Sequence, residues 1–183
     1  MVSDQREEMA RTDDPQLQLA GFMAKYSPEI AALAEAARNQ MCKLYPMALE
    51  LVYDNYNALA IGYSPTERTS DAIFSIALFP RWVSLFFLQA RGLPDPCGLL
   101  KGSGTVAKHI VLPSPALLHE PAVRDLRNEA VARAKTPFDP HMQHRLIIKS
   151  ISKVQRPRRP AGETKARTAR SKRPVARTVK SKV

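Results

Sequence analysis

Apolar residues recur at spacings of three and four in an early stretch of the chain. Ser27-Pro28-Glu29 supplies an N-cap residue, a proline for the first helical turn and an early acid. The apolar positions that follow are Ile30, Leu33, Ala34, Ala37, Met41 and Leu44. This spacing puts them on one face of a helix, which Pro46 is expected to end. The pattern predicts an amphipathic helix from Pro28, preceded by a short helix around residues 17–23.

After this helix the pattern changes to that of extended strands. Strand-like segments cover residues 49–53 and 58–63, and two nearly continuous apolar runs follow at residues 73–79 and 82–88, with Pro80-Arg81 as the turn between them. Continuous apolar runs are typical of central strands that other elements cover. Four strands joined by short connections predict an antiparallel meander.

The remaining elements complete an α+β fold. Residues 91–104 hold four of the seven glycines and predict an irregular loop, and residues 106–112 predict a fifth strand. A further helix is expected from Pro121, and the apolar run 146–148 should close the sheet or dock on it. We therefore predict an antiparallel sheet of five to six strands with helices packed on one face. Residues 1–14 are expected to be disordered, residues 15–150 to form the domain, and residues 151–183 to be a basic disordered tail.

The charges of the chain are unevenly distributed. There are 28 Lys and Arg residues against 17 Asp and Glu, a net charge of +11. Residues 151–183 contain 12 of the cations and one acid, Glu163, so they account for the whole excess. No large apolar residue other than valine follows Val154, and a segment of this composition is expected not to fold alone.

Such a block of cations can follow nucleic-acid phosphates without reading bases. Its spacing among alanine, threonine and proline resembles the tails of linker-histone-like proteins, and the lack of aromatic residues disfavours base stacking. The alternatives are a solubilising extension and a segment that contacts membrane or acidic protein. The predicted phosphate contacts are Lys153, Arg156, Arg158, Arg159, Lys165, Arg167, Arg170, Lys172, Arg173, Arg177, Lys180 and Lys182.

The sequence also argues against several classes of protein. Cys42 and Cys97 are too few for a disulfide framework and lack metal-binding spacing. The start of the chain shows no secretory signal. The longest apolar stretch, residues 73–90, carries Pro80-Arg81 near its centre, which disfavours a membrane span. We expect a cytoplasmic protein with reduced thiols and no membrane span.

A second candidate chemistry lies in the glycine-rich loop and the first hairpin. Backbone N–H groups of such a loop can bind an anion, although the endings typical of a P-loop or a dinucleotide fingerprint are missing. The alternative is a wide turn that needs positive φ. Aromatic and polar residues of the hairpin line a ligand pocket over the sheet or simply pack there. The candidate ligand residues are Tyr53, Asn55, Gly98, Lys101, Gly102, Ser103 and Gly104.

The sequence predicts no metal site and no catalytic group. His141 and His144 are three residues apart and far in sequence from both cysteines, so we expect them to be loop histidines in solvent. An iron site on the helix after Pro28 would have only Glu29 and Glu35, which nearby cations offset. We therefore expect no cofactor and no enzymatic activity.

Several motifs resemble those of the YdhG-like domains of unknown function. They are Tyr53-Asp54-Asn55-Tyr56, Leu85-Phe86-Phe87-Leu88, the loop from Gly92 to Gly104, and the stretches 148–152 and 155–160. The resemblance covers residues 28–160 and implies the fold of frataxin-like domains, with two helices on one face of an antiparallel sheet. It implies no agreed activity, although some relatives are labelled iron chaperones.

These observations give one leading hypothesis and two alternatives. The leading one is a non-enzymatic, YdhG-like protein that binds nucleic acid non-specifically through its tail and is associated with the nucleoid. The first alternative is a domain that binds a small ligand with its sheet face and glycine-rich loop. The second is a frataxin-like protein that handles iron.

Overall fold

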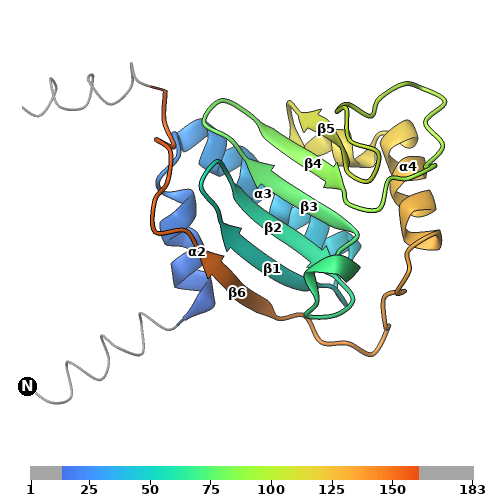
Figure 1. The fold of residues 1–183 in the computed structure, drawn as a ribbon, viewed down its shortest axis with the longest axis horizontal. Helices are drawn as coiled ribbons and strands as arrows, with labels where there is room; N and C mark the ends of the chain where they lie inside the picture. The colour runs from blue at the N-terminus through green and yellow to red at the C-terminus, as the bar shows by residue number, and fades with distance from the viewer. Residues whose placement is uncertain (1–13, 161–183) are drawn as a thin grey trace, which may run out of the picture.

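The computed structural model describes residues 14–160, which form three α-helices and one six-stranded sheet (Figure 1). The helices are α2 (Pro15–Met23), α3 (Pro28–Leu44) and α4 (Pro121–Ala132). The strands are β1 (Leu49–Asp54), β2 (Leu59–Ser64), β3 (Phe74–Leu78), β4 (Val83–Phe87), β5 (Lys108–Leu112) and β6 (Leu146–Ile151). Two short 3₁₀ turns are η1 (Thr69–Asp71) and η2 (Pro115–His119). The predicted α+β class is confirmed.

Helix α3 begins at the predicted Pro28, whereas α2 begins at Pro15, two residues before the predicted start. The Asp14 carboxylate accepts a hydrogen bond from the backbone N–H of Gln16 at 2.9 Å, and α2 follows with Pro15 in its first turn. Ser27 caps α3 by accepting from the N–H of Ile30 at 3.4 Å, with Pro28 again in the first turn. Each cap satisfies a backbone donor that has no partner inside the helix.

The six strands lie in the order β5-β4-β3-β2-β1-β6. Neighbours from β1 to β5 are antiparallel, so the predicted meander is confirmed. β6 differs, because it pairs with β1 in parallel. It reaches this edge through the segment after α4, which runs along one end of the sheet (Figure 1), and such a long connection lets a strand enter in either direction.

The core lies between the sheet and its helices, and α3 crosses the sheet behind the central strands in Figure 1. Every second residue of a strand points toward this layer. These residues pair with one another across neighbouring strands and so form rows across the sheet. The largest such row is Val52, Ile61, Ile76, Leu85 and Ile110, each at most 6% exposed. The same alternation places Glu50 and Asp54, both 0% exposed, on the helix side of β1. Two carboxylates are therefore buried in the core layer.

Residues 152–160, here called the C-terminal strap, lie against the domain. The backbone N–H of Ser152 donates to the Asp54 carbonyl and that of Arg156 to the Tyr56 carbonyl, both at 2.9 Å. The predicted boundary at residue 150 is therefore wrong, since the folded part extends to Pro160. Polar contacts attach this segment to the domain. Its composition predicts disorder because it has few large apolar residues, and composition does not register such contacts. Expectations for residues 1–13 and 161–183 lie outside the described residues.

None of the helices in residues 14–160 combines the length and the hydrophobicity that a transmembrane helix needs.

Candidate functional site

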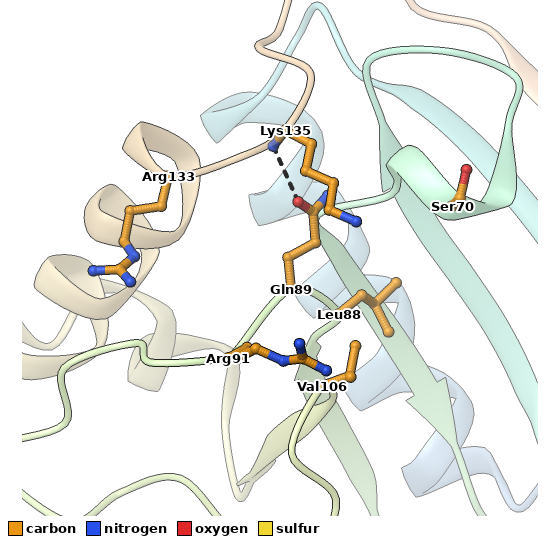
Figure 2. A pocket seen from close by; sticks show the side chains of 7 residues that line it. All are labelled: Ser70, Leu88, Gln89, Arg91, Val106, Arg133 and Lys135. Atoms are coloured by element: carbon orange, nitrogen blue, oxygen red, sulfur yellow. Dashed lines mark hydrogen bonds between the residues drawn. The ribbon is translucent and has the colours of Figure 1, made fainter.

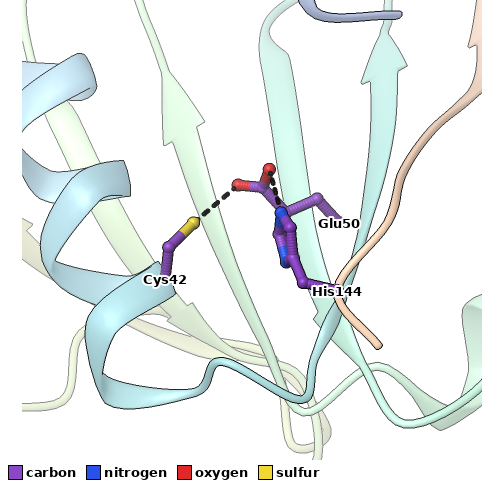
Figure 3. Close-up of side chains that lie close together, drawn as sticks. All are labelled: Cys42, Glu50 and His144. Atoms are coloured by element: carbon purple, nitrogen blue, oxygen red, sulfur yellow. Dashed lines mark hydrogen bonds and ion pairs between the residues drawn. The ribbon is translucent and has the colours of Figure 1, made fainter. Parts of the chain in front are cut away.

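Cys42, Glu50 and His144 form a compact polar cluster at one edge of the core (Figure 3). Their side-chain sulfur, oxygen and nitrogen atoms all lie within 4.8 Å of one another. Cys42 lies on α3, Glu50 lies on β1, and His144 lies just before β6. The parallel pairing of β6 with β1 brings His144 to this position, since Leu146 pairs with Glu50.

Glu50 is fully buried but does not lack partners. Arg38, one helical turn before Cys42, donates to both carboxylate oxygens, with Nε 2.8 Å from Oε1 and Nη2 2.6 Å from Oε2. Burial raises the pKa of the Glu50 carboxyl, but hydrogen bonds from His144 and Arg38 and their positive charges outweigh it and lower the pKa below its usual value. Glu50 is therefore an anion held by a bidentate arginine.

His144 is oriented by its two ring nitrogens. Nδ1 lies 2.9 Å from the carbonyl oxygen of Ala48, and because a carbonyl can only accept, Nδ1 carries a proton. Nε2 then faces Glu50, with its Oε2 at 3.4 Å. The hydrogen bond to Glu50 raises the pKa of His144. The expectation of a free loop histidine is wrong for this residue, although its side chain is still 31% exposed.

Cys42 is a protonated thiol in this arrangement. Its sulfur lies 3.4 Å from Oε1 of Glu50, to which it donates. Burial and the Glu50 carboxylate raise the pKa of the Cys42 thiol to about 12. A thiol with so high a pKa is a poor nucleophile at neutral pH. The cluster therefore does not form an activated cysteine of the kind found in thiol enzymes.

Tyr63 completes the surroundings of the cluster. It lies directly opposite Glu50 in the β1–β2 ladder and so shares the helix-facing side of the sheet. Its side chain is 0% exposed, and its hydroxyl has no hydrogen-bond partner among residues 14–160. Burial, followed by the charge of Glu50, raises its pKa well above the usual value. A buried polar group left without a partner is uncommon in folded proteins.

A second polar cluster fixes the C-terminal strap to Asp54. Lys25 Nζ lies 2.6 Å from Oδ2 of this carboxylate, and Arg158 Nη2 lies 2.8 Å from Oδ1. The side chains of Arg158 and Asp54 are only 3% and 1% exposed. Gln155 accepts from Lys25 at 2.9 Å. Asp54 is thus paired with two cations, one of them more than 100 residues away in sequence.

The strap changes the assignment of the predicted phosphate contacts. Arg158 is buried in its ion pair, and Arg159 donates to the backbone carbonyls of Ala24 at 3.0 Å and Tyr26 at 2.9 Å. The buried guanidinium of Arg158 is not available to phosphate, whereas Arg159 is partly exposed and its prediction as a phosphate contact is not tested. Lys153 and Arg156 remain exposed. The other predicted contacts, from Lys165 to Lys182, lie outside the described residues.

Hydrogen bonds to the Asp95 carboxylate, within the loop itself, stabilise the glycine-rich loop. Oδ1 and Oδ2 of Asp95 accept from the backbone N–H groups of Leu99 at 2.9 Å and Leu100 at 2.8 Å. The N–H of Gly98 donates to the Asp95 carbonyl at 3.2 Å, and that of Lys101 to the His109 carbonyl at 2.8 Å. Four successive donors are therefore unavailable to an anion.

The conformation of this loop fits a wide turn. Gly98 and Gly102 have φ of +62° and +110°, values that favour glycine. Ser103 and Gly104 belong instead to the wall of a shallow cavity that also includes Lys108.

The structure does not bring the remaining predicted ligand residues to this loop. Tyr53 lies on β1, and its hydroxyl is 2.6 Å from Oγ1 of Thr69. Asn55 forms the turn after β1, where its N–H donates to Ala58 at 3.0 Å and its carbonyl accepts from Arg158. The loop contacts β5, at the opposite edge of the sheet from β1 and β6. The predicted combined pocket is therefore not formed.

A cationic cavity of about 320 Å³ lies at the end of the sheet beside α4 (Figure 2). Arg91, Arg133 and Lys135 line it, together with Ser70, Leu88, Gln89 and Val106. Gln89 braces the wall, donating to the carbonyls of Asp71 at 3.2 Å and Ala72 at 3.3 Å and accepting from the N–H of Lys135 at 3.1 Å. A Cβ at Gly92 would lie 3.3 Å from Nη2 of Arg133, so Arg133 lies against the loop that carries Arg91.

The described part of the chain is an α+β protein with a six-stranded sheet, a Cys-Glu-His cluster around the buried Glu50, and a C-terminal strap. No protein-family model, curated protein or solved structure matches the chain.

Signals in the sequence could have located part of the buried polar cluster. Glu50 lies inside an apolar strand, where alternation forces it onto the same face as Val52. Arg38 and Cys42 are four residues apart on a predicted helix, so they share a face. The position of His144 required the parallel pairing of β6, which has no signal in the local pattern.

Proposed function

We propose that this protein binds nucleic acid non-specifically through its basic C-terminal residues, and that its folded domain is a non-enzymatic, YdhG-like module associated with the nucleoid. The observation that carries the proposal is the separation of charge along the chain. Four of the 12 cations after residue 150 belong to residues 151–160, so eight remain in residues 161–183 with a single acid. Such a segment releases condensed counterions when it contacts phosphates.

The fold contributes an anchor for this basic segment. Arg158 and Arg159 fix the strap to Asp54 and to the end of α2, so residue 161 follows a point that is held against the domain. Lys153 and Arg156 are exposed on the same strap. Arg156 lies 5.4 Å from the centre of the Tyr56 ring, a cation–π contact that leaves its charge at the surface. We infer that these two residues extend the phosphate-binding surface onto the domain.

Binding to duplex DNA over a salt series tests this proposal. Eight phosphate contacts correspond to a log–log salt slope of about −7, and sequence preference should be weak because the contacts are to the backbone. The full chain is compared with residues 1–160, which keep the strap. We expect the shortened chain to lose most of the affinity and most of the slope.

A matched control keeps the length of the chain and changes its charge. Replacing Lys165, Arg167, Arg170 and Lys172 by glutamine should reduce the slope by about four, whereas the double variant Lys153→Gln, Arg156→Gln should reduce it by two at most. Equal binding by residues 1–160 and the full chain would overturn the proposal. Preference for anionic vesicles over DNA would instead favour a membrane-surface role.

A second candidate function is the binding of a small anion in the cationic cavity. The observation that favours it is that Arg91, from the loop after β4, and Arg133 and Lys135, from the end of α4, line one cavity of about 320 Å³. Arg133 also lies 3.5 Å from Glu129. Pyrophosphate is a suitable probe, with binding followed by NMR shifts of backbone amides. We expect saturable shifts around Gln89 that Arg133→Ala weakens and Arg124→Ala, an exposed change on the same helix, does not. Shifts that never saturate, or that are equal in both variants, count against this site.

Iron handling of the frataxin type receives little support from the helix surface. Glu35 on α3 lies 3.8 Å from Arg38, which is itself bound to Glu50. A cation-binding ridge needs several free carboxylates in one place.

A further inference from the structure

Three side chains with different ligand atoms meet at the buried edge of the core. The Cys42 sulfur and the His144 Nε2 each lie 3.4 Å from a carboxylate oxygen of Glu50, and all three ligand atoms lie within 4.8 Å. A tetrahedral zinc ion with bonds of about 2.0–2.3 Å holds its ligand atoms about 3.3–3.7 Å apart. The two 3.4 Å distances are to different oxygens, Oε1 for Cys42 and Oε2 for His144, so one separation matches this geometry whichever oxygen binds. The others, within 4.8 Å, require a small inward movement.

The atoms behind these ligands are arranged as they are around bound metals. His144 donates its Nδ1 proton to the carbonyl of Ala48 at 2.9 Å, which fixes the ring and directs Nε2 at the cluster. The Nε2 proton, which His144 donates to Glu50 without metal, must leave when a metal binds. Arg38 holds the Glu50 carboxylate at 2.8 Å and 2.6 Å. Metal-binding histidines typically donate their second nitrogen to a carbonyl, and metal-binding carboxylates are themselves hydrogen-bonded.

An independent feature points to a missing partner at this position. The hydroxyl of Tyr63 is completely buried opposite Glu50 and has no hydrogen-bond partner in the described part of the chain. Leaving such a hydroxyl without a partner destabilises the folded state. A metal-bound water, or the metal itself, would supply the partner that residues 14–160 do not.

We propose that Cys42, Glu50 and His144 are the three protein ligands of a site for zinc or a zinc-like divalent transition metal, with the fourth position facing the Tyr63 hydroxyl. One sulfur, one imidazole nitrogen and one carboxylate oxygen are the ligand types that zinc accepts, whereas calcium and magnesium prefer oxygen alone. Three protein ligands leave one coordination position for water.

Binding exchanges protons for the metal. The S–H bond of Cys42 breaks and a metal–sulfur bond forms; where His144 is protonated, its Nε2–H bond breaks and a metal–nitrogen bond forms. Both protons leave to solvent. The metal brings two positive charges beside the Cys42 thiolate and the Glu50 carboxylate, while Arg38 keeps its contact with the outer side of Glu50. Because Arg38 already compensates Glu50 without a metal, the fold does not depend on the ion. The site is therefore a binding site rather than a folding requirement, and it is independent of the proposed nucleic-acid binding.

Cobalt(II) is the probe for this site, because a thiolate ligand gives it a charge-transfer absorption band in the near ultraviolet. The full chain, first freed of metal with a chelator, is titrated with cobalt and then with zinc. We expect one equivalent of cobalt to produce the band and zinc to abolish it by displacement. Proton release, measured with a pH indicator, is a second readout: one proton per metal ion comes from Cys42, and a second from His144 wherever that residue is protonated.

The two cysteines provide a matched pair of variants. Cys42→Ser should lose the band, whereas Cys97→Ser, at an exposed cysteine in the loop after β4, should keep it. His144→Gln should weaken cobalt binding at least tenfold, and its partly exposed position makes loss of the fold a small risk. Circular dichroism of each variant in chelator verifies that the domain is folded. A band that persists in Cys42→Ser, disappears in Cys97→Ser, or never forms in the folded parent protein overturns the proposal.

Discussion

Replacement of Arg158 by alanine is the sharpest test of the C-terminal strap. Arg158 lies in a segment whose composition predicts disorder, yet its side chain is 3% exposed and 2.8 Å from Asp54. The substitution removes this ion pair and a hydrogen bond to the carbonyl of Asn55. It also removes a cation–π contact, in which Cζ of Arg158 lies 5.5 Å from the centre of the Tyr26 ring. Asp54 then stays buried, with Lys25 at 2.6 Å as its remaining ion-pair partner among residues 14–160.

The expected loss of stability follows from that remaining partner. Removing one member of a buried ion pair costs about 3–5 kcal/mol, because the other charge is left in a medium that solvates it poorly. Lys25 still compensates Asp54, so we expect the lower end, about 3 kcal/mol. For a domain of this size that loss corresponds to a decrease in Tm of about 6–12 °C.

Urea denaturation followed by circular dichroism measures this loss. Arg156→Ala is the matched control, because Arg156 is exposed and two residues away, and we expect it to cost less than about 1 kcal/mol. Truncation supplies a second comparison: residues 1–160 should be as stable as the full chain, and residues 1–150 should lose at least as much as Arg158→Ala. If Arg158→Ala unfolds within about 0.5 kcal/mol of the parent, the normal range for surface changes, the strap does not stabilise the domain as argued.

Further predictions concern the folded boundary, a buried tyrosine and the metal site. Limited trypsin digestion should leave a core that ends near residue 160, and rapid cleavage after Lys153 would contradict the attachment of the strap, since the Arg156–Pro157 bond resists trypsin in any conformation. Tyr26→Phe should cost about 2 kcal/mol in denaturation, because the Tyr26 hydroxyl donates to Leu78 at 3.0 Å and accepts from Leu59 at 2.9 Å; Tyr53→Phe, at an exposed contact, should cost far less. The metal-free protein should unfold cooperatively in chelator, and zinc at 100 times its Kd should add about 2.7 kcal/mol. A zinc-independent Tm would count against the site.

The sequence predicts the regular elements well, because their signals are local. Ser27-Pro28 fixes the start of α3, and the apolar runs on either side of Pro80-Arg81 give β3 and β4 nearly to the residue. Alternation along β1 also contains the information that Glu50 and Asp54 face the core. The strand pattern does not identify the partners of these two carboxylates, because Arg38, His144 and Arg158 approach them only in the tertiary structure.

The direction of β6 and the attachment of the strap are outside the reach of local patterns. A run such as Leu146-Ile147-Ile148 is equally compatible with parallel and antiparallel pairing. Composition arguments rank a segment by the apolar area it can bury, and residues 152–160 bury little. Their order arises from charge pairing with Asp54 and from donors that Arg159 gives to the end of α2.

The pairing of Asp54 with Arg158 also sets an order of events during synthesis. The two residues are 104 positions apart, and β6, which flanks β1, is made almost as late. A ribosome adds about 5–20 residues per second, so Arg158 is synthesised on the order of 5–20 seconds after Asp54. Strands β2 to β5 and helix α4 are synthesised within that interval, whereas α2, α3 and β1 are already made when it begins. The nascent domain therefore reaches its final stability only after residues 146–160 have left the ribosome, and the basic residues from 161 onward emerge immediately after them.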